Sequence, residues 1–275
     1  MNIATVEVSI GQGGDAMQRA SSAAVKKSNV AGLTFYEASD IVNQVEPIFR
    51  FKHPTHSFEL PKARSVMMTA AEKFGDGIED IAIDVKIPDG LGKAWTVQTL
   101  ATYDKVLFEI AYEAIKNINN AGFKRYISLS QPRTAGIDTY FFNAIDTTKP
   151  SYSENADPNL RLTFDAWQTV GKMSWSWYAD NVFVNMTYYK AERVPGEPVG
   201  DNGIRVTVQS AQHVLMLYAP KDNVTLAGAL SNYEKKIPLL VQERLTKEAG
   251  AKSKGLKIMR DWIDPSIGGV VVPKH

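Results

Sequence analysis

Two histidines and a carboxylate within seven residues are the first candidates for chemistry in this sequence. His53, His56 and Glu59 stand in the segment His-Pro-Thr-His-Ser-Phe-Glu, and imidazole and carboxylate groups are good ligands for zinc or iron. Pro54 prevents the helical i, i+4 presentation of zincin-type sites, and in an extended segment the two histidines would point to opposite faces. A metal-dependent enzyme that uses these three residues is therefore the second alternative function, and the leading interpretation includes no metal ligand and no catalytic residue.

Other catalytic patterns are missing from the sequence. The chain has no cysteine, which excludes disulfides, thiolate metal ligands and cysteine nucleophiles. It has no Gly-x-Ser-x-Gly elbow. Its glycine-rich runs at 11–14 and 90–93 lack the spacing of a P-loop or a dinucleotide-binding loop. Asp80 and Asp84 alternate with apolar residues, which places them on the solvated face of a strand. The sequence therefore predicts a non-enzymatic protein without a cofactor.

Large aromatic residues gather in the second half of the chain. Trp175 and Trp177 are two positions apart, so both indoles share one face of an extended strand. Such a face fills a sheet core, forms a subunit interface, or stacks bases or sugars, and core packing is the commonest of the three roles. The residues kept as interface candidates are Trp175, Trp177, Tyr188 and Trp262.

Basic residues are enriched near both ends of the chain. The candidate nucleic-acid contacts are Arg19, Lys26, Lys27, Lys252, Lys254, Lys257 and Arg260. Local groups of this kind can neutralise phosphates even though the net charge is only +1. They are equally typical of an ordinary solvated surface. A nucleic-acid-binding protein that uses the basic tail and the Trp/Tyr faces is therefore the first alternative function.

The elements expected to position these residues follow from the hydrophobic periodicity. Helices are expected at 39–45, 61–74, 96–121, 225–236 and 238–249. Strands are expected at 2–10, 80–88, 126–130, 139–145, 160–164, 182–189, 204–208 and 214–218. Residues 11–29 are expected to be a mobile arm or a loose helix, and residues 33–58 to be irregular apart from the short helix.

These elements predict an α+β fold in which a central long helix packs on a mostly antiparallel sheet. A flexible N-terminal arm and a C-terminal tail complete it. The expected division is an N-terminal strand and arm at 1–30, a globular body at 31–250 that is β-rich from about 124 to 220, and a basic tail at 251–275. Glycine and valine at 268–272 suggest one added strand in the tail.

Composition narrows the class of protein. Hydrophobic residues make up 44% and charged residues 22% of the chain, which is typical of a globular protein. We find no signal-peptide pattern and no apolar stretch of about 20 residues, so we expect a location in the cytoplasm or a virion and no membrane partner. Extensions on a compact body are common in self-assembling proteins. We therefore expect a homo-oligomeric structural protein of the viral coat or nucleocapsid kind, whose partners are itself and, as a further class, nucleic acid.

Overall fold

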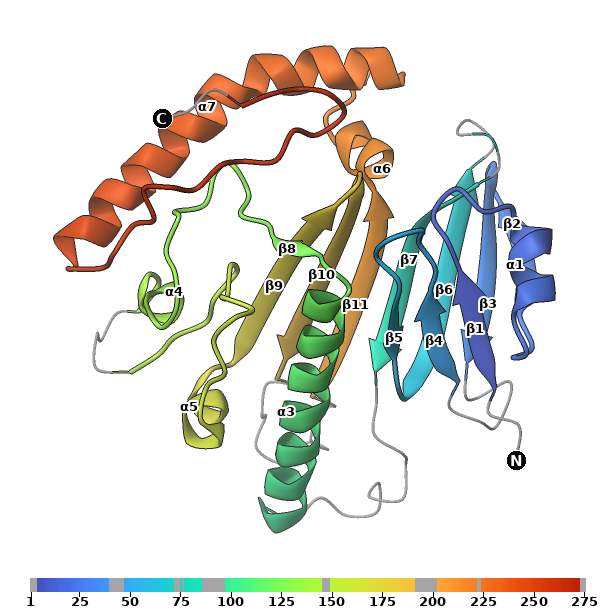
Figure 1. Cartoon of the computed structure of the whole chain (residues 1–275), viewed down its shortest axis with the longest axis horizontal. Coiled ribbons are helices and arrows are strands. Elements are labelled where there is room, and N and C mark those ends of the chain that lie inside the picture. Colours follow the sequence, from blue (N-terminus) through green and yellow to red (C-terminus); the bar gives the residue numbers. More distant parts are fainter. Residues whose placement is uncertain are drawn as a thin grey trace.

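The computed structural model describes residues 4–39, 47–71, 75, 77–85, 97–144, 149–190, 202–221 and 224–272. The helices are α1 (Gly14–Ala20), α3 (Val97–Asn120), α4 (Asp138–Phe141), α5 (Phe164–Thr169), α6 (Ala211–Met216) and α7 (Leu226–Ser253). The strands are β1 (Thr5–Val8), β2 (Lys26–Val30), β3 (Leu33–Ser39), β4 (Ile48–Phe51), β5 (Phe58–Leu60), β6 (Ala63–Ala71), β7 (Ile78–Val85), β8 (Lys124–Arg125), β9 (Lys172–Ala179), β10 (Val182–Tyr189) and β11 (Gly203–Ser210). The fold is α+β, as the sequence predicts (Figure 1).

An eight-stranded antiparallel sheet forms the main layer of the protein. Its strand order is β2-β3-β6-β7-β11-β10-β9-β8, so strands from the two halves of the sequence meet where β7 pairs with β11. Apolar residues alternate with polar ones along both strands, as the period of two requires. On the polar face Asp84 binds Arg205 at 2.8 Å and Asp80 accepts a hydrogen bond from Gln209. Both aspartates therefore stabilise the solvated face, as expected.

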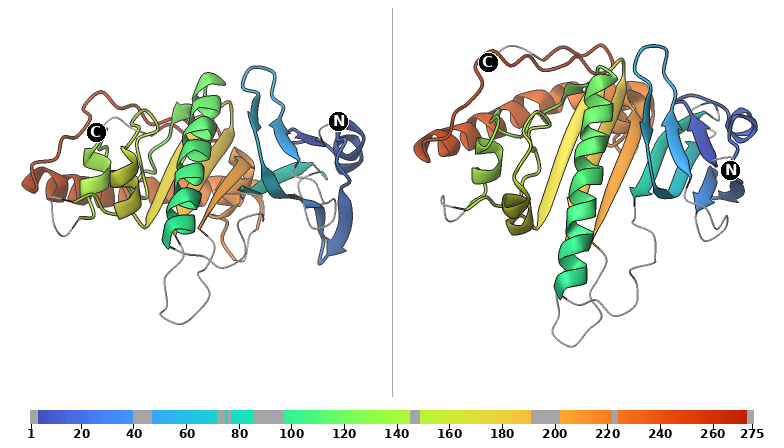
Figure 2. Two further views of the ribbon diagram at one scale, coloured as in Figure 1. Left: turned by 90° about the horizontal axis from the view of Figure 1, so that it is seen from below. Right: turned by 60° about the horizontal axis from the view of Figure 1, so that its bottom comes forward.

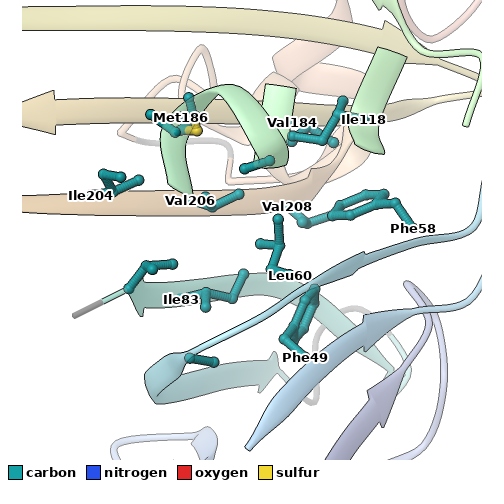
Figure 3. Close-up of a cluster of buried hydrophobic side chains, with 14 of the residues drawn as sticks. Phe49, Phe58, Leu60, Ile83, Ile118, Val184, Met186, Ile204, Val206 and Val208 are labelled. Carbon is teal, nitrogen blue, oxygen red and sulfur yellow. The ribbon is translucent and has the colours of Figure 1, made fainter. Parts of the chain in front are cut away.

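A three-stranded sheet covers one half of the apolar face. Its order is β1-β4-β5, with β1 parallel to β4 and β4 antiparallel to β5. Phe49 and Leu60 are buried and lie beside Ile83 of the large sheet (Figure 3). The small sheet therefore closes the core over β6 and β7 and fixes the position of the β4–β5 loop.

The long helix α3 covers the other half of the same face (Figures 1 and 2). Its buried stripe repeats every three or four residues, as in an amphipathic helix, and consists of Tyr103, Leu107, Ile110, Ala114 and Ile118. Ile118 lies next to Val184 of β10, and Met186 belongs to the same buried cluster (Figure 3). The helix predicted at 96–121 is thus confirmed over Val97–Asn120. In the described part of the chain, no helix is long and apolar enough to span a bilayer.

The N-terminal segment belongs to the core, which corrects the expectation of a flexible arm. The predicted strand at 2–10 is confirmed as β1. The segment at 11–29 contains the helix α1, which the sequence allowed, but it ends in the strand β2, which the sequence did not predict. Val6, Val8 and Met17 have no exposed surface. Because small residues (glycine, alanine and serine) dominate this part of the sequence, the few large side chains that pack in the core are easily overlooked.

Two expectations for residues 33–74 also need correction. The segment at 33–58 contains β3, β4 and the start of β5, so it is not irregular. The segment at 61–74 contains the strand β6 where a helix was expected. Over this short stretch its apolar residues fit the period of a helix as well as that of a strand. Pairing with β3 and β7 stabilises the strand. The short helix expected at 39–45 lies outside the described residues, except that Ser39 ends β3.

Several short predicted strands of the second half are helices or loops. The segments at 139–145 and 214–218 overlap the helices α4 and α6, and 160–164 leads into the first residue of α5. The hydroxyl groups of Thr163 and Ser210 cap the starts of α5 and α6 by accepting hydrogen bonds from Ala166 and His213. The segment at 126–130 is a loop after β8. The strands predicted at 182–189 and 204–208 are confirmed as β10 and β11.

The C-terminal part forms a separate layer beside the β9–β10 hairpin. The two helices expected at 225–236 and 238–249 are one helix, α7, which contains Pro238. Residues 254–272 return along α7 (Figure 1), and Ile267 and Val270 pack in the same buried cluster as Tyr233 and Ile237. The described part of the expected tail, up to residue 272, is therefore packed, and its suggested strand is reduced to one bridge between Ile267 and Val270.

Candidate functional site

His53 and His56 lie in the loop that joins β4 to β5. The Ser57 hydroxyl holds this loop in a turn, because it accepts a hydrogen bond from the His53 backbone N–H at 2.9 Å and donates one to the His53 carbonyl at 2.7 Å. The two imidazole rings stack with their centroids 5.2 Å apart. The expectation that they point to opposite faces is therefore wrong, since the segment is a turn and not an extended strand.

The third member of the cluster is Asp180, in the turn between β9 and β10. Asp180 and Asn181 have positive φ angles of 43° and 64°, as in a two-residue hairpin turn. The Asp180 carboxylate lies 3.2 Å from His56 Nε2 and accepts a hydrogen bond from the Thr55 hydroxyl at 3.3 Å. One side-chain ligand atom from each of His53, His56 and Asp180 lies within 4.8 Å of the others.

The backbone after α3 orients the His56 ring. His56 Nδ1 lies 2.7 Å from the carbonyl oxygen of Ala121. Because a carbonyl only accepts hydrogen bonds, Nδ1 carries a proton and Nε2 faces Asp180. Gly122 has φ +87°, and a Cβ there would come within 3.0 Å of His56 Nδ1. The glycine therefore allows the close approach that fixes the imidazole.

The pKa of His53 is lowered from its ordinary value. Partial burial is the main cause, the charge of His56 adds to it, and Asp180 acts in the opposite direction. At neutral pH this favours an uncharged His53 ring, which can accept a hydrogen bond or bind a cation.

Glu59, the carboxylate suggested by the sequence, is not part of this cluster. It lies on the exposed side of β5 and binds Arg50 Nε at 2.5 Å. Asp180 takes its place from a position more than 120 residues further along the chain. The sequence signal for Asp180 is weak: an Asp-Asn pair between two strands indicates a hairpin turn, but it does not indicate which loop the turn will meet.

A cleft of about 670 Å³ adjoins the cluster and is lined in part by His53 and Asp180. Glu79 of β7 and Ser210 of β11 line the same cleft, and the Ser210 hydroxyl donates a hydrogen bond to the Glu79 carboxylate. Ser210 also accepts a hydrogen bond from the His213 backbone N–H at 2.9 Å. The cleft is therefore lined by a buried acid and a hydroxyl together with the imidazole of His53 and the carboxylate of Asp180.

The aromatic interface candidates are placed differently. Trp175, Trp177 and Tyr188 are completely buried in the protein's own core, and Trp177 Nε1 donates a hydrogen bond to Asn119 Oδ1 of α3 at 2.8 Å. Trp262 is half-buried and donates to Asp264. Of the roles considered for the aromatic face, core packing is the one that this position allows, because fully buried rings cannot contact another molecule.

The candidate nucleic-acid contacts form two groups at opposite ends of the protein. Arg19, Lys26 and Lys27 lie on α1 and β2, whereas Lys252, Lys254, Lys257 and Arg260 lie at and beyond the far end of α7 (Figures 1 and 2). Two of the lysines have neighbours within the chain. Lys27 lies 3.6 Å from Asp15, and Lys254 donates a hydrogen bond to the carbonyl of Phe142 at 2.8 Å. The fold does not join these residues into one basic patch.

Two buried ion pairs, which the sequence did not suggest, anchor α7. Arg133 donates to both oxygens of Glu248 at 2.7 and 2.9 Å, and Arg244 donates to both oxygens of Asp264 at 2.6 and 2.8 Å. Burial alone would raise the pKa of Glu248, but the hydrogen bonds and charge of Arg133 outweigh it, and the pKa is lowered. The orientation of α7 is therefore fixed by bidentate, charge-assisted contacts.

Large exposed apolar side chains concentrate in the layer formed by residues 211–272, which we call the α7 layer. Its members with more than a third of their surface exposed are Leu217, Val224, Leu239, Leu245, Ile263 and Val271. Leu239 is 71% exposed and lies on the side of α7 opposite its buried residues. An exposed apolar side chain such as Leu239 can be part of a contact surface.

Comparison of the chain with protein-family models, with curated proteins and with solved structures gave no match. The functional argument therefore depends on the residues and geometry of this chain.

Proposed function

We propose that this protein is a non-enzymatic, self-assembling structural protein of the viral coat or nucleocapsid kind, and that copies associate through the outer face of α7. The observation that carries the proposal is the exposed apolar surface of the α7 layer, with Leu239 at the middle of its helix. A self-association of this kind fits a protein that resides in the cytoplasm or in a virion.

Among the described residues, this face of α7 is exposed, and Leu239 keeps 71% of its surface accessible. The residues that α7 buries against the body include Tyr233, Ile237 and Val241, four positions apart, so they form one side of the helix. Leu239 lies on the other side. Burying an exposed leucine side chain contributes about 1.5–3 kcal/mol. A contact that covers the outer face would therefore gain stability without any rearrangement of the core.

The charges around Leu239 favour a second copy of the chain as the partner. Lys235 precedes Leu239 by four residues, and Glu243 follows it by four residues, so all three share one helical face. If two α7 helices pack antiparallel about a two-fold axis at Leu239, each Lys235 faces the Glu243 of the other copy. A self-complementary surface of this kind is what a two-fold dimer requires. The net charge of +1 adds little long-range repulsion between copies.

Nucleic-acid binding is less well supported. Its two basic groups are separated by the length of the protein (Figure 2), and three of the aromatic candidates, Trp175, Trp177 and Tyr188, are completely buried. A continuous strip of positive charge is the usual footprint of a nucleic-acid-binding protein. We therefore keep nucleic acid as a possible cargo of an assembly, not as the ligand that defines the function.

Sedimentation velocity on charge variants tests the proposed contact. Lys235→Glu alone and Glu243→Lys alone should each weaken self-association, because each places like charges opposite one another. The double variant restores the pairing and should recover the association. Val30→Glu, which changes another exposed apolar residue on β2, is the control and should associate as the wild type does. If the double variant is weaker than both single variants, the antiparallel arrangement is wrong.

A further inference from the structure

We propose that His53, His56 and Asp180 bind one divalent transition-metal ion of the zinc class. The site is independent of the proposed self-association, because it lies in the β4–β5 loop and the β9–β10 turn and not on α7. Two imidazoles and one carboxylate form a ligand set that such ions prefer.

The distances between the ligand atoms fit a metal ion. Zinc binds imidazole nitrogen and carboxylate oxygen at about 2.0–2.2 Å, so two ligand atoms of a tetrahedral site lie about 3.3 Å apart. His56 Nε2 and Asp180 Oδ2 are already 3.2 Å apart. All three ligand atoms lie within 4.8 Å of one another, so a small rotation of His53 would complete a three-ligand site.

The surroundings of His56 match those of a metal ligand. A ligating histidine usually donates its other ring N–H to a carbonyl or a carboxylate, which fixes the tautomer and the ring orientation. His56 Nδ1 is 2.7 Å from the Ala121 carbonyl, and Gly122 leaves the room that the ring needs. Nε2 is then the nitrogen that remains for the ion. This contact is present without any ion, so the site is preorganised on this side.

The position of the ligands predicts what the ion would do. His53 and His56 belong to the loop of the small sheet, and Asp180 belongs to a turn of the large sheet. An ion bound by all three would therefore join the two sheets at this end of the molecule and stabilise the folded state. Three protein ligands leave one position of a tetrahedral ion for water or a small ligand. His53 and Asp180 also line the 670 Å³ cleft, so that position is accessible from the cleft.

The competing explanation is that His56 and Asp180 form only an ion pair. Both explanations predict the observed 3.2 Å contact, but they differ in the role of His53 and in the response to metal. The Asp180→Asn variant separates them well. Asparagine tolerates the positive φ of this turn position and can still accept the hydrogen bond from Thr55, so the turn should be kept while the carboxylate is lost.

The test is a titration of the full-length protein, prepared without a polyhistidine tag and freed of metal with a chelator, with Zn²⁺ in a calorimeter. The wild type should bind one Zn²⁺ per chain and melt at a higher temperature when it is saturated. Asp180→Asn and His53→Gln should each weaken binding by at least about tenfold and remove the shift in melting temperature. Glu59→Gln and His213→Gln are the matched controls and should bind as the wild type does.

Two results would overturn the proposal. One is a wild type that binds no saturable equivalent of Zn²⁺. The other is a binding curve that Asp180→Asn and His53→Gln both leave unchanged, because the ion would then occupy another position. Melting curves without metal show whether each variant is folded. Because the two substitutions lie in different loops, a folding defect in one variant leaves the other variant as a valid test. Self-association through α7 should be the same with and without Zn²⁺.

Discussion

Replacing Glu248 with glutamine removes one charge from the buried ion pair with Arg133 while the shape of the side chain is kept. The carboxylate accepts two hydrogen bonds from the Arg133 side chain and a third from its backbone N–H at 3.1 Å. Glu248 is 2% and Arg133 7% exposed. The substitution therefore leaves a guanidinium group buried without a compensating charge.

Loss of one partner of a buried pair costs about 3–5 kcal/mol. In a chain of 150–250 residues, each kcal/mol lowers the melting temperature by about 2–4 °C, and a slightly longer chain should respond in a similar way. The control is Glu234→Gln on the same helix. Glu234 is exposed, and a surface substitution of this kind changes the free energy of unfolding by no more than about 0.5 kcal/mol.

Urea unfolding of the wild type and the two variants measures these differences. Hydrogen exchange should also show that Glu248→Gln loosens α7 before the central sheet, because Arg133 joins that helix to the loop after β8. If Glu248→Gln and Glu234→Gln unfold at the same urea concentration, the buried pair does not anchor α7 and the reasoning fails.

Two further predictions concern pH and the N-terminal segment. The pKa of Glu248 is lowered in the folded state, so its contribution to stability is fully present above the pKa of this group in the unfolded chain and is lost as the pH falls through the folded pKa. The difference in unfolding free energy between wild type and Glu248→Gln should therefore disappear in acid. A difference that stays constant down to low pH would contradict this. Met17→Ala should cost about 2–5 kcal/mol because Met17 is completely buried. The neighbouring exposed residue Arg19, changed to alanine, should cost within about 0.5 kcal/mol. Equal melting temperatures for these two variants would mean that the N-terminal segment is an arm after all.

The parts of the fold that the sequence predicts correctly are those with long, regular periodicity. The helix α3 keeps an apolar stripe over about four turns, from Tyr103 to Ile118. Buried and less buried residues alternate along most of β7, β10 and β11, so the local pattern and the final packing agree. The β6 strand was missed because Val66, Met67, Ala70 and Ala71 satisfy the helical period over a short window. Only its two neighbouring strands, which are not local in sequence, decide for extended structure.

The candidate site was only partly accessible from the sequence for the same reason. His53 and His56 attract attention because they are close together in the chain, but Asp180 joins them only through the packing of the two sheets. The exposure of Leu239 and the pairing of Arg133 with Glu248 are likewise tertiary facts. Trp175 and Trp177 illustrate the opposite case, because the strand pattern placed both indoles on one face but did not indicate that α3 and α5 would cover it.

The mass of the wild-type protein in solution tests the central claim, self-association through α7, most directly. Light scattering coupled to size-exclusion chromatography, over a range of protein and salt concentrations, should give a mass that is a multiple of 30.4 kDa. The variant Leu239→Glu should shift that mass towards a single chain while its melting temperature stays close to that of the wild type. A wild-type protein that remains at 30.4 kDa at the highest concentration, in low and in high salt, would contradict the account.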